Sequence, residues 1–228
     1  MTATATESRP VTVDRALRSG GVSSDAIHQM VARAVEPRHP RGGVLVDVGC
    51  GKGKLWSHLG RLFDRYVGAD VVRYEGFPAD AAFCPVDLDA QRVLLPDAAG
   101  DVVVAVETIE HLENPRAFVR ELVRLARPGA WVVVTTPNQL SLLSKMTLVL
   151  KNQFNAFQQS SYPAHLTALL EIDLRRIAVE CGLTDVAVAY TQQGRIAGTP
   201  WHYPRMLSRC WPRGLSDNVL VIGKKPRA

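Results

Sequence analysis

The sequence predicts an α/β domain in which a mostly parallel sheet carries helices on both faces. Short β-branched segments alternate along the chain with segments whose apolar residues recur at helical spacing. The first strand segment, residues 44–48, is a nearly continuous apolar run that ends in glycines, which is typical of strands buried on both faces. This alternation implies right-handed βαβ units and therefore a doubly wound sheet.

Each element has its own local signal. Ser23 or Ser24 is expected to cap a first helix that Pro37 ends. Phe118, Leu122 and Leu125 recur at helical spacing. Further helices are predicted at residues 55–63, 115–127 and 166–181. Pro128-Gly129 is expected to break the second of these, and Gly182 to stop the third. Strands are predicted at residues 44–48, 65–70, 83–86, 101–106, 131–136, 185–190 and 218–222.

Composition narrows the class of protein. The chain has 228 residues, 46% of them hydrophobic, and a formal net charge of +5, which favours an anionic partner only weakly. The sequence has no run of about 18 apolar residues, so no membrane span is predicted. Its first residues lack the apolar core of a secretory signal. We therefore expect a cytoplasmic protein with reduced cysteines. The cysteines form no CxxC pair and stand at Cys50, Cys84, Cys181 and Cys210.

The domain is expected to cover residues 23–228, after a disordered or loosely packed lead over residues 1–22. A helical insert is expected at about residues 139–163, as a lid or cover over an acceptor site. Because its residues 140–150 are apolar nearly all round a helix, it is normally expected to be buried, as a core helix or a homodimer contact. The alternative is a lid over an apolar acceptor or a contact with a membrane surface.

A glycine-rich turn follows the first strand, in the sequence Asp47-Val48-Gly49-Cys50-Gly51-Lys52-Gly53. Glycines at alternate positions allow a tight turn and a close approach of the backbone to a ligand. The next helix offers free N–H groups to a carboxylate. Lys54 stands where a dinucleotide enzyme of the GxGxxG type has its third glycine. A simple strand-to-helix turn is the alternative interpretation of this motif.

The ends of the next strands also carry polar groups. Asp70 can accept hydrogen bonds from both ribose hydroxyls, or it can cap a turn. Asp87-Leu88 follows the third strand, where an acid can accept a proton from an adenine amino group, a role for which Asp89 competes. Glu107 follows the fourth strand. Suitable groups at four strand ends together favour a ligand site more strongly than any one of them.

As a set, the segments VLVDVGCGKGKL, VGADV, CPVDLD, AVETIEHLENP and RLARPGAWVVVTTPN resemble the successive motifs of class I S-adenosylmethionine-dependent methyltransferases. The group with the greatest similarity includes ubiquinone-biosynthesis, sugar and natural-product O-methyltransferases. The resemblance runs from about residue 44 to 138 and implies a Rossmann-like seven-stranded sheet, mostly parallel, whose last strand is antiparallel.

The resemblance implies S-adenosyl-L-methionine as cofactor. Asp47, Gly49, Gly51 and Gly53 would line its methionine and ribose part, and Glu107 would lie near the methionine end. Asp70 would hold the ribose hydroxyls, Val71 would lie against adenine, and Asp87 and Leu88 would meet the adenine edge. The chain departs from many relatives in the segment VVRYEGFPAD, where they carry a longer helix, so a loop is expected beside adenine.

The acceptor is expected to be a small molecule, and a hydroxyl of a sugar, polyketide, phenol or lipid-linked precursor is favoured. A hydroxyl acceptor benefits from a general base, most often histidine. His111, which follows the fourth strand, and His165, before the last long helix, are the candidates, although each can instead be structural. Glu110 can orient a histidine or lie exposed. His202 is expected to be exposed.

No metal site is predicted, because the sequence has no helix-spaced histidine pair and no obvious acidic triplet. A loop that mixes arginines with aromatic rings spans residues 195–213, but no separate RNA-binding module accompanies it, so nucleic acid is not favoured. Alternatives to a small-molecule methyltransferase are an RNA methyltransferase, a non-catalytic S-adenosylmethionine-binding protein and a nicotinamide oxidoreductase. The glycine spacing argues against the last.

Overall fold

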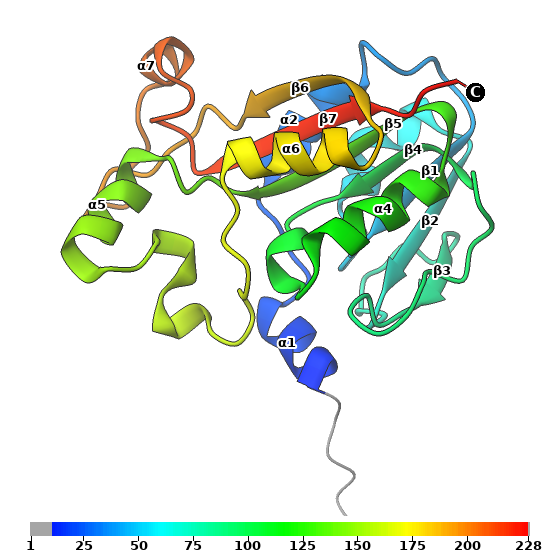
Figure 1. The fold of residues 1–228 in the computed structure, drawn as a ribbon, viewed down its shortest axis with the longest axis horizontal. Helices are drawn as coiled ribbons and strands as arrows, with labels where there is room; N and C mark the ends of the chain where they lie inside the picture. Colours follow the sequence, from blue (N-terminus) through cyan, green and yellow to red (C-terminus); the bar gives the residue numbers. More distant parts are fainter. Residues whose placement is uncertain (1–10, 228) are drawn as a thin grey trace, which may run out of the picture.

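The structure is a computed structural model that describes residues 11–227. Its centre is a seven-stranded sheet in the order β3-β2-β1-β4-β5-β7-β6 (Figure 1). The strands are β1 (Val44–Val48), β2 (Arg65–Asp70), β3 (Ala82–Pro85), β4 (Gly100–Ala105), β5 (Ala126–Pro137), β6 (Thr184–Tyr190) and β7 (Asn218–Lys224).

Strand directions confirm the predicted doubly wound fold. β1 pairs in parallel with β2 and β4, whereas β7 runs antiparallel to both β5 and β6. The strand order reverses at β1, from which the chain first builds outward through β2 and β3 and then returns to β4 on the other side. In open α/β sheets, ligands bind at the carboxyl ends of the strands beside such a reversal.

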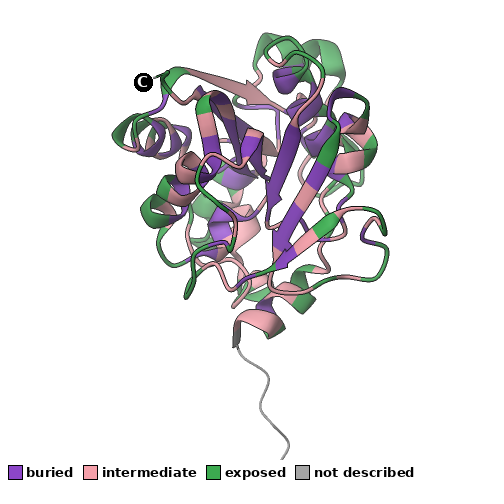
Figure 2. Cartoon of the chain, turned by 90° about the vertical axis from the view of Figure 1, so that its right-hand side faces the viewer, coloured by how far each residue is buried: buried purple, intermediate pink, exposed green. Residues whose placement is uncertain are grey.

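Helices cover both faces of the sheet because its central strands are apolar on both. Alternate residues of β4 face opposite ways: Val102 and Val104 pack in one hydrophobic cluster, Val103 and Ala105 in the other. The first cluster includes residues of α2 (Asp25–Val35) and α3 (Leu55–Leu59). The second includes residues of α4 (Pro115–Leu125) and α6 (Glu171–Glu180). Figure 2 shows the buried strands between these partly exposed helices.

Several helix boundaries differ from the predicted ones. The helix predicted over 55–63 is α3 followed by a 3-10 turn, Gly60–Leu62. Pro128-Gly129 does not break the preceding helix: α4 already ends at Leu125, and β5 begins at once with Ala126 beside Gly100. Ser24 occupies the predicted N-cap position of α2, but its side chain makes no cap hydrogen bond.

The helix predicted to begin at Leu166 begins at Glu171 instead. The backbone N–H groups of Leu166 and Thr167 both donate to the Glu110 carbonyl, and the Thr167 hydroxyl donates to the Leu112 carbonyl. These long-range bonds hold residues 166–167 extended, so local helical periodicity does not decide their conformation.

The insert forms α5 (Leu142–Lys151) and two short 3-10 turns, Asn155–Phe157 and Gln159–Ser161. The core-helix alternative is wrong: Ser144 is the one buried residue of α5, while Val149 is 84% and Leu150 78% exposed, and the homodimer contact stays a prediction. α5 projects from the end of the sheet that also carries α7 (Arg205–Cys210) (Figure 1). Among residues 11–227, no helix is long and apolar enough to cross a membrane.

The expected loose lead over residues 1–22 is partly helical. Residues 1–10 lie outside the described residues, whereas Val11–Ser19 forms helix α1. The Thr12 hydroxyl donates to Asp87, and the Tyr74 hydroxyl donates to the Ala16 carbonyl. Contacts with side chains far along the sequence therefore fix α1 against the domain, which the polar composition of this segment does not predict.

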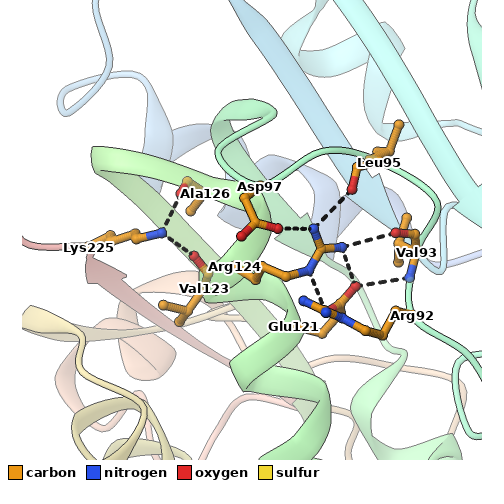
Figure 3. Close-up of polar contacts among 9 residues, drawn as sticks. All are labelled: Arg92, Val93, Leu95, Asp97, Glu121, Val123, Arg124, Ala126 and Lys225. Atoms are coloured by element: carbon orange, nitrogen blue, oxygen red, sulfur yellow. Dashed lines mark hydrogen bonds and ion pairs between the residues drawn. The ribbon is translucent and has the colours of Figure 1, made fainter.

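A cluster of polar contacts lies at the end of the sheet where β4 and β5 begin (Figure 3). The Arg124 guanidinium bonds to Glu121 and Asp97 and also donates to the carbonyls of Val93 and Leu95. The Lys225 ammonium donates to two carbonyls at the end of α4. These contacts tie residues 93–97 and the end of the chain to α4.

Candidate functional site

A pocket of about 270 Å³ opens at the carboxyl ends of β1, β2, β3 and β4. Its walls include every residue predicted to bind the cofactor except Gly53, together with both candidate histidines. The structure therefore brings to one cavity side chains that the sequence places at separate strand ends. The predicted residues in its lining are Asp47, Gly49, Gly51, Asp70, Val71, Asp87, Leu88, Glu107, His111 and His165.

The glycine loop after β1 adopts backbone angles that disfavour other residues. Gly49, Gly51 and Gly53 all have positive φ, between 51° and 75°. A Cβ on Gly49 would lie 2.2 Å from the Thr108 hydroxyl oxygen. On Gly53 it would lie 2.6 Å from Pro78, which belongs to the loop after β2. Gly53 thus allows close packing of two loops, and it does not line the pocket.

Asp70 ends β2 and is tied to the glycine loop. Its carboxylate accepts the Gly51 N–H at 2.9 Å and the Val71 N–H at 2.7 Å. Burial raises the pKa of Asp70, while these backbone donors act in the opposite direction. Residues 71–81 contain no helix, as expected from VVRYEGFPAD, and Val71 still lines the pocket.

Asp47 is buried beneath the pocket, and the sequence does not predict its partner. The Tyr66 hydroxyl donates to Asp47 Oδ2 at 2.7 Å. The other oxygen, Oδ1, has no hydrogen-bond partner among residues 11–227. Burial raises the pKa of Asp47 to about 7. An unpartnered buried carboxylate oxygen in the pocket wall fits an ammonium group of a ligand.

Glu107 follows β4 with a left-handed backbone, φ +50°. Its carboxylate accepts a hydrogen bond from Asn218 Nδ2 at 2.8 Å, and its N–H donates to the Thr135 hydroxyl at 3.0 Å. Burial and the neighbouring Glu110 raise its pKa well above the usual value. These contacts hold a non-glycine residue in a strained conformation at the site, as is common for functional residues.

Helix α1 and the loop after it contribute pocket residues that sequence reasoning missed. The Thr12 hydroxyl donates to Asp87 at 2.9 Å, and Arg15 lies 3.4 Å from Asp89 and 3.3 Å from the His111 carbonyl oxygen. The Gly21 carbonyl accepts the Lys52 N–H at 2.9 Å. α1 therefore covers Asp87 and Asp89, the two candidates predicted to meet adenine, and no local signal in the segment indicates this.

His111 and His165 face each other although 53 residues separate them. Their ring centroids are 4.8 Å apart, in an edge-to-face arrangement. His111 Nδ1 lies 2.7 Å from the Ala164 carbonyl oxygen, and His165 Nδ1 lies 2.5 Å from that of Ala156. Burial lowers the pKa of His111 to about 4 and also lowers that of His165. Burial thus favours the neutral form of both rings.

Glu110 lies behind the histidines and is fully buried, so the alternative of an exposed residue is wrong. Its Oε2 accepts the Thr136 hydroxyl at 3.0 Å. Burial raises the pKa of Glu110 to about 8. A neutral histidine that keeps a free ring nitrogen can accept a proton, so this end of the pocket has the groups that acid–base chemistry requires.

A second, polar pocket of about 450 Å³ adjoins the first, because Glu107 lines both. Its walls come from the loops after β5 and β6, the start of β7 and residues of the insert. His202, exposed as expected, is part of its lining, and Arg195 pairs there with Asp217 at 3.1 Å. Cofactor and acceptor can thus occupy neighbouring spaces on either side of Glu107.

The sheet order and the pocket at its reversal define a doubly wound α/β domain with a ligand pocket at its strand ends. A family model described as a methyltransferase domain matches residues 22–188, which is more than half of the chain. The chain belongs to this methyltransferase-domain family, whose cofactor is S-adenosylmethionine.

Individual relatives of the chain are also named as methyltransferases. A ubiquinone biosynthesis O-methyltransferase of Methylobacterium sp. (strain 4-46) is 37% identical over 110 residues, covering 45% of this chain and 44% of the relative. A probable S-adenosylmethionine-dependent methyltransferase of Mycolicibacterium smegmatis is 32% identical, covering 63% of this chain and 56% of the relative. The chain thus spans about half the length of these curated relatives.

A solved methyltransferase structure shares the fold. The S-adenosylmethionine-dependent methyltransferase of Archaeoglobus fulgidus superposes with a TM-score of 0.61 at 18% identity, covering 87% of this chain and 94% of that one.

Proposed function

We propose that this protein transfers a methyl group from S-adenosylmethionine to a hydroxyl group of a small molecule. The observation that carries the proposal is the placement of two neutral histidines in the wall of the cofactor pocket, next to Glu107. Amine acceptors need only to be deprotonated, whereas hydroxyl acceptors benefit from a positioned base, so this pair favours O-methylation.

When bound, S-adenosylmethionine supplies an electrophilic methyl group on a positively charged sulfur. The chain's own residues hold it in place. Asp70 would accept hydrogen bonds from the ribose hydroxyls, and Asp87 and Leu88 would meet the adenine edge, with Val71 against the ring. The free oxygen of Asp47 would accept a hydrogen bond from the methionine ammonium group.

The histidines would hold the acceptor proton. A backbone carbonyl can only accept a hydrogen bond, so the Nδ1 atoms beside Ala164 and Ala156 carry the ring protons. In neutral rings this leaves each Nε2 with its lone pair. His111 would take the hydroxyl proton at Nε2 as the oxygen forms its bond to the methyl carbon and the carbon–sulfur bond breaks.

The second pocket would receive the acceptor. Amide, hydroxyl and charged side chains line it, which suits an acceptor with several polar groups, such as a sugar or a polar head group. The insert contributes Ser141, Ser144, Asn155 and Ala156 to this lining. The insert would therefore act as part of the acceptor site.

The exposed face of α5 supports a lipid-linked acceptor. Val149 and Leu150 are largely exposed, and Lys145 and Lys151 are exposed on the same helix. Apolar side chains accompanied by lysines are the composition with which helices dock on anionic bilayers. α5 would hold the domain at an anionic membrane surface while the polar head group enters the second pocket.

Isothermal titration with S-adenosylhomocysteine tests the cofactor assignment. We expect saturable binding to the wild-type chain, none of NAD, and at least tenfold weaker binding to Asp70→Asn, because the amide cannot accept hydrogen bonds as a carboxylate does. Asp80→Asn, an exposed carboxyl outside the pocket, is the control. Binding of NAD in place of S-adenosylhomocysteine would contradict the proposed function.

A further inference from the structure

Glu110, His111 and His165 converge at one end of the cofactor pocket. One potential ligand atom of each residue lies within 4.8 Å of the others. All three residues line the pocket. Two imidazoles and a carboxylate are a donor set that first-row transition metals bind.

Glu110 carries the observation that points to a ligand. Its side chain is fully buried, and only Oε2 is bonded, to the Thr136 hydroxyl. Oε1 is buried and finds no hydrogen-bond partner in the part of the chain that the structure describes. Leaving a buried carboxyl oxygen without a partner costs about 1–3 kcal/mol, so a bound group at this position would offset the cost.

The two histidines are oriented as metal ligands are. Each places its Nδ1 beside a backbone carbonyl, of Ala164 and of Ala156 respectively, which orients the ring and favours the tautomer with an unprotonated Nε2. Metal-binding histidines almost always donate their other ring nitrogen in this way. Packing between the rings, 4.8 Å apart, holds both in the same place.

We propose that Glu110, His111 and His165 bind a divalent first-row metal ion, of which Zn²⁺ is the probe we would use. Three protein ligands leave a fourth position open toward the pocket, as in catalytic rather than structural zinc sites. Bonds of 2.0–2.2 Å place tetrahedral ligands about 3.4 Å apart. Binding would thus draw the ligand atoms, now within 4.8 Å of one another, closer by up to about 1.4 Å. The sequence does not predict this site, because its histidines are not spaced on one helix.

The catalytic consequence rests on the proposed function. A hydroxyl held at the open position of the metal has a lowered pKa, as metal-bound water has. Its proton then passes to water, and the oxygen is free to form its bond to the methyl carbon. Where the ion is bound, it replaces His111 as the group that activates the hydroxyl, because the Nε2 lone pair that would take the proton is then on the metal.

A second trio, Asp25, His28 and His58, provides the matched comparison. Its ligand atoms also lie within 4.8 Å of one another, but the Asp25 side chain is 77% exposed and already lies 3.7 Å from His58. An exposed carboxylate remains hydrated, so its removal from water opposes binding. We expect this trio to hold a metal much more weakly.

The test uses the untagged full chain, stripped with a chelator and titrated with Zn²⁺ by calorimetry, with bound zinc counted by mass spectrometry. We expect one tight Zn²⁺ per chain. Glu110→Gln and His165→Ala should each raise the zinc Kd at least a hundredfold, and His58→Ala should leave it within threefold. Circular dichroism and S-adenosylhomocysteine binding show whether each variant is folded.

Two results would overturn the metal site: absence of stoichiometric zinc in the folded wild-type chain, or loss of zinc in His58→Ala with retention in His165→Ala. If the stripped chain binds S-adenosylhomocysteine but no Zn²⁺, the proposed function stands and the metal site falls. If it binds Zn²⁺ through His165 but no S-adenosylhomocysteine, the metal site stands and the proposed function falls.

Discussion

At the scale of single residues, the site is a set of carboxyl groups kept from water at the ends of buried strands. Asp47 lies in β1, and Glu107 and Glu110 follow β4; burial raises the pKa of each one. Such groups cost folding free energy once they ionise. Their retention is physically reasonable where a ligand supplies the missing partner, as we propose for Asp47 and Glu110.

Asp47 gives a prediction on stability against pH. Its pKa is about 7 in the folded chain and near 3.8 when unfolded, so between these values only the folded state keeps the proton. Stability therefore falls as the pH rises through this window. We expect the unfolding free energy of the ligand-free wild type to fall more between pH 5 and pH 8 than that of Asp47→Asn, measured with urea.

The exposed Asp80→Asn variant is the control, since it should follow the wild-type profile at both pH values. Parallel profiles for wild type and Asp47→Asn would show that this carboxyl is already ionised in the folded chain.

At the scale of elements, two segments take roles that their own composition does not set. α1 and the loop after it are held on the pocket by Thr12, Ala16 and Gly21, each through a contact with a residue far along the chain. α5 stays exposed although it is apolar nearly all round, because little of the domain packs on it. Partners elsewhere in the molecule decide both outcomes.

Gly51→Ala tests the docking of the N-terminal segment. A Cβ on Gly51 would lie 2.4 Å from the Gly21 carbonyl oxygen, so the segment must move away. We expect faster trypsin cleavage at Arg15 and Arg18 and weaker S-adenosylhomocysteine binding. Gly76→Ala is the matched control, since Gly76 also has a positive φ but nothing within 4 Å of its added Cβ. Equal cleavage of both variants would mean that backbone strain alone causes the effect.

The exposed face of α5 gives a prediction on membrane binding. We expect the wild-type chain to float with phosphatidylglycerol vesicles and not with phosphatidylcholine vesicles, and Val149→Ser/Leu150→Ser to float at least fivefold less. Thermal unfolding should be nearly unchanged, because both side chains are largely exposed. Val179→Ser, an exposed apolar residue of α6, should float as the wild type does. Failure of the wild-type chain to float with phosphatidylglycerol vesicles would rule out the membrane contact.

At the scale of the whole molecule, the Arg124 cluster and the two pockets lie at opposite ends of the sheet. The Arg124 cluster closes the end where β4 and β5 begin (Figure 3), whereas both pockets open where parallel strands end. Arg124 and Glu121 are each about nine-tenths buried, and the guanidinium satisfies two loop carbonyls as well. This end can be altered without touching a ligand.

Arg124→Ala should therefore lower the unfolding free energy by about 2–4 kcal/mol, because Glu121 and two carbonyls lose their charged donor. Binding of S-adenosylhomocysteine should stay within threefold of wild type. Arg92→Ala removes the exposed partner of the same Glu121 and should cost about 0.5 kcal/mol or less. Urea unfolding measures both, and a cofactor defect in Arg124→Ala would show that the two ends are coupled.

The sequence by itself determined the strand positions, the doubly wound class and the residues at the strand ends, because these depend on local apolar runs and on glycines with positive φ. The tertiary structure decided the rest. The start of α6, the exposure of α5, the docking of α1, the Tyr66 partner of Asp47 and the meeting of His111 with His165 all depend on contacts between residues far apart in the chain. Local periodicity carries no information about such contacts, since the same segment can lie helical, extended, buried or exposed according to what packs against it.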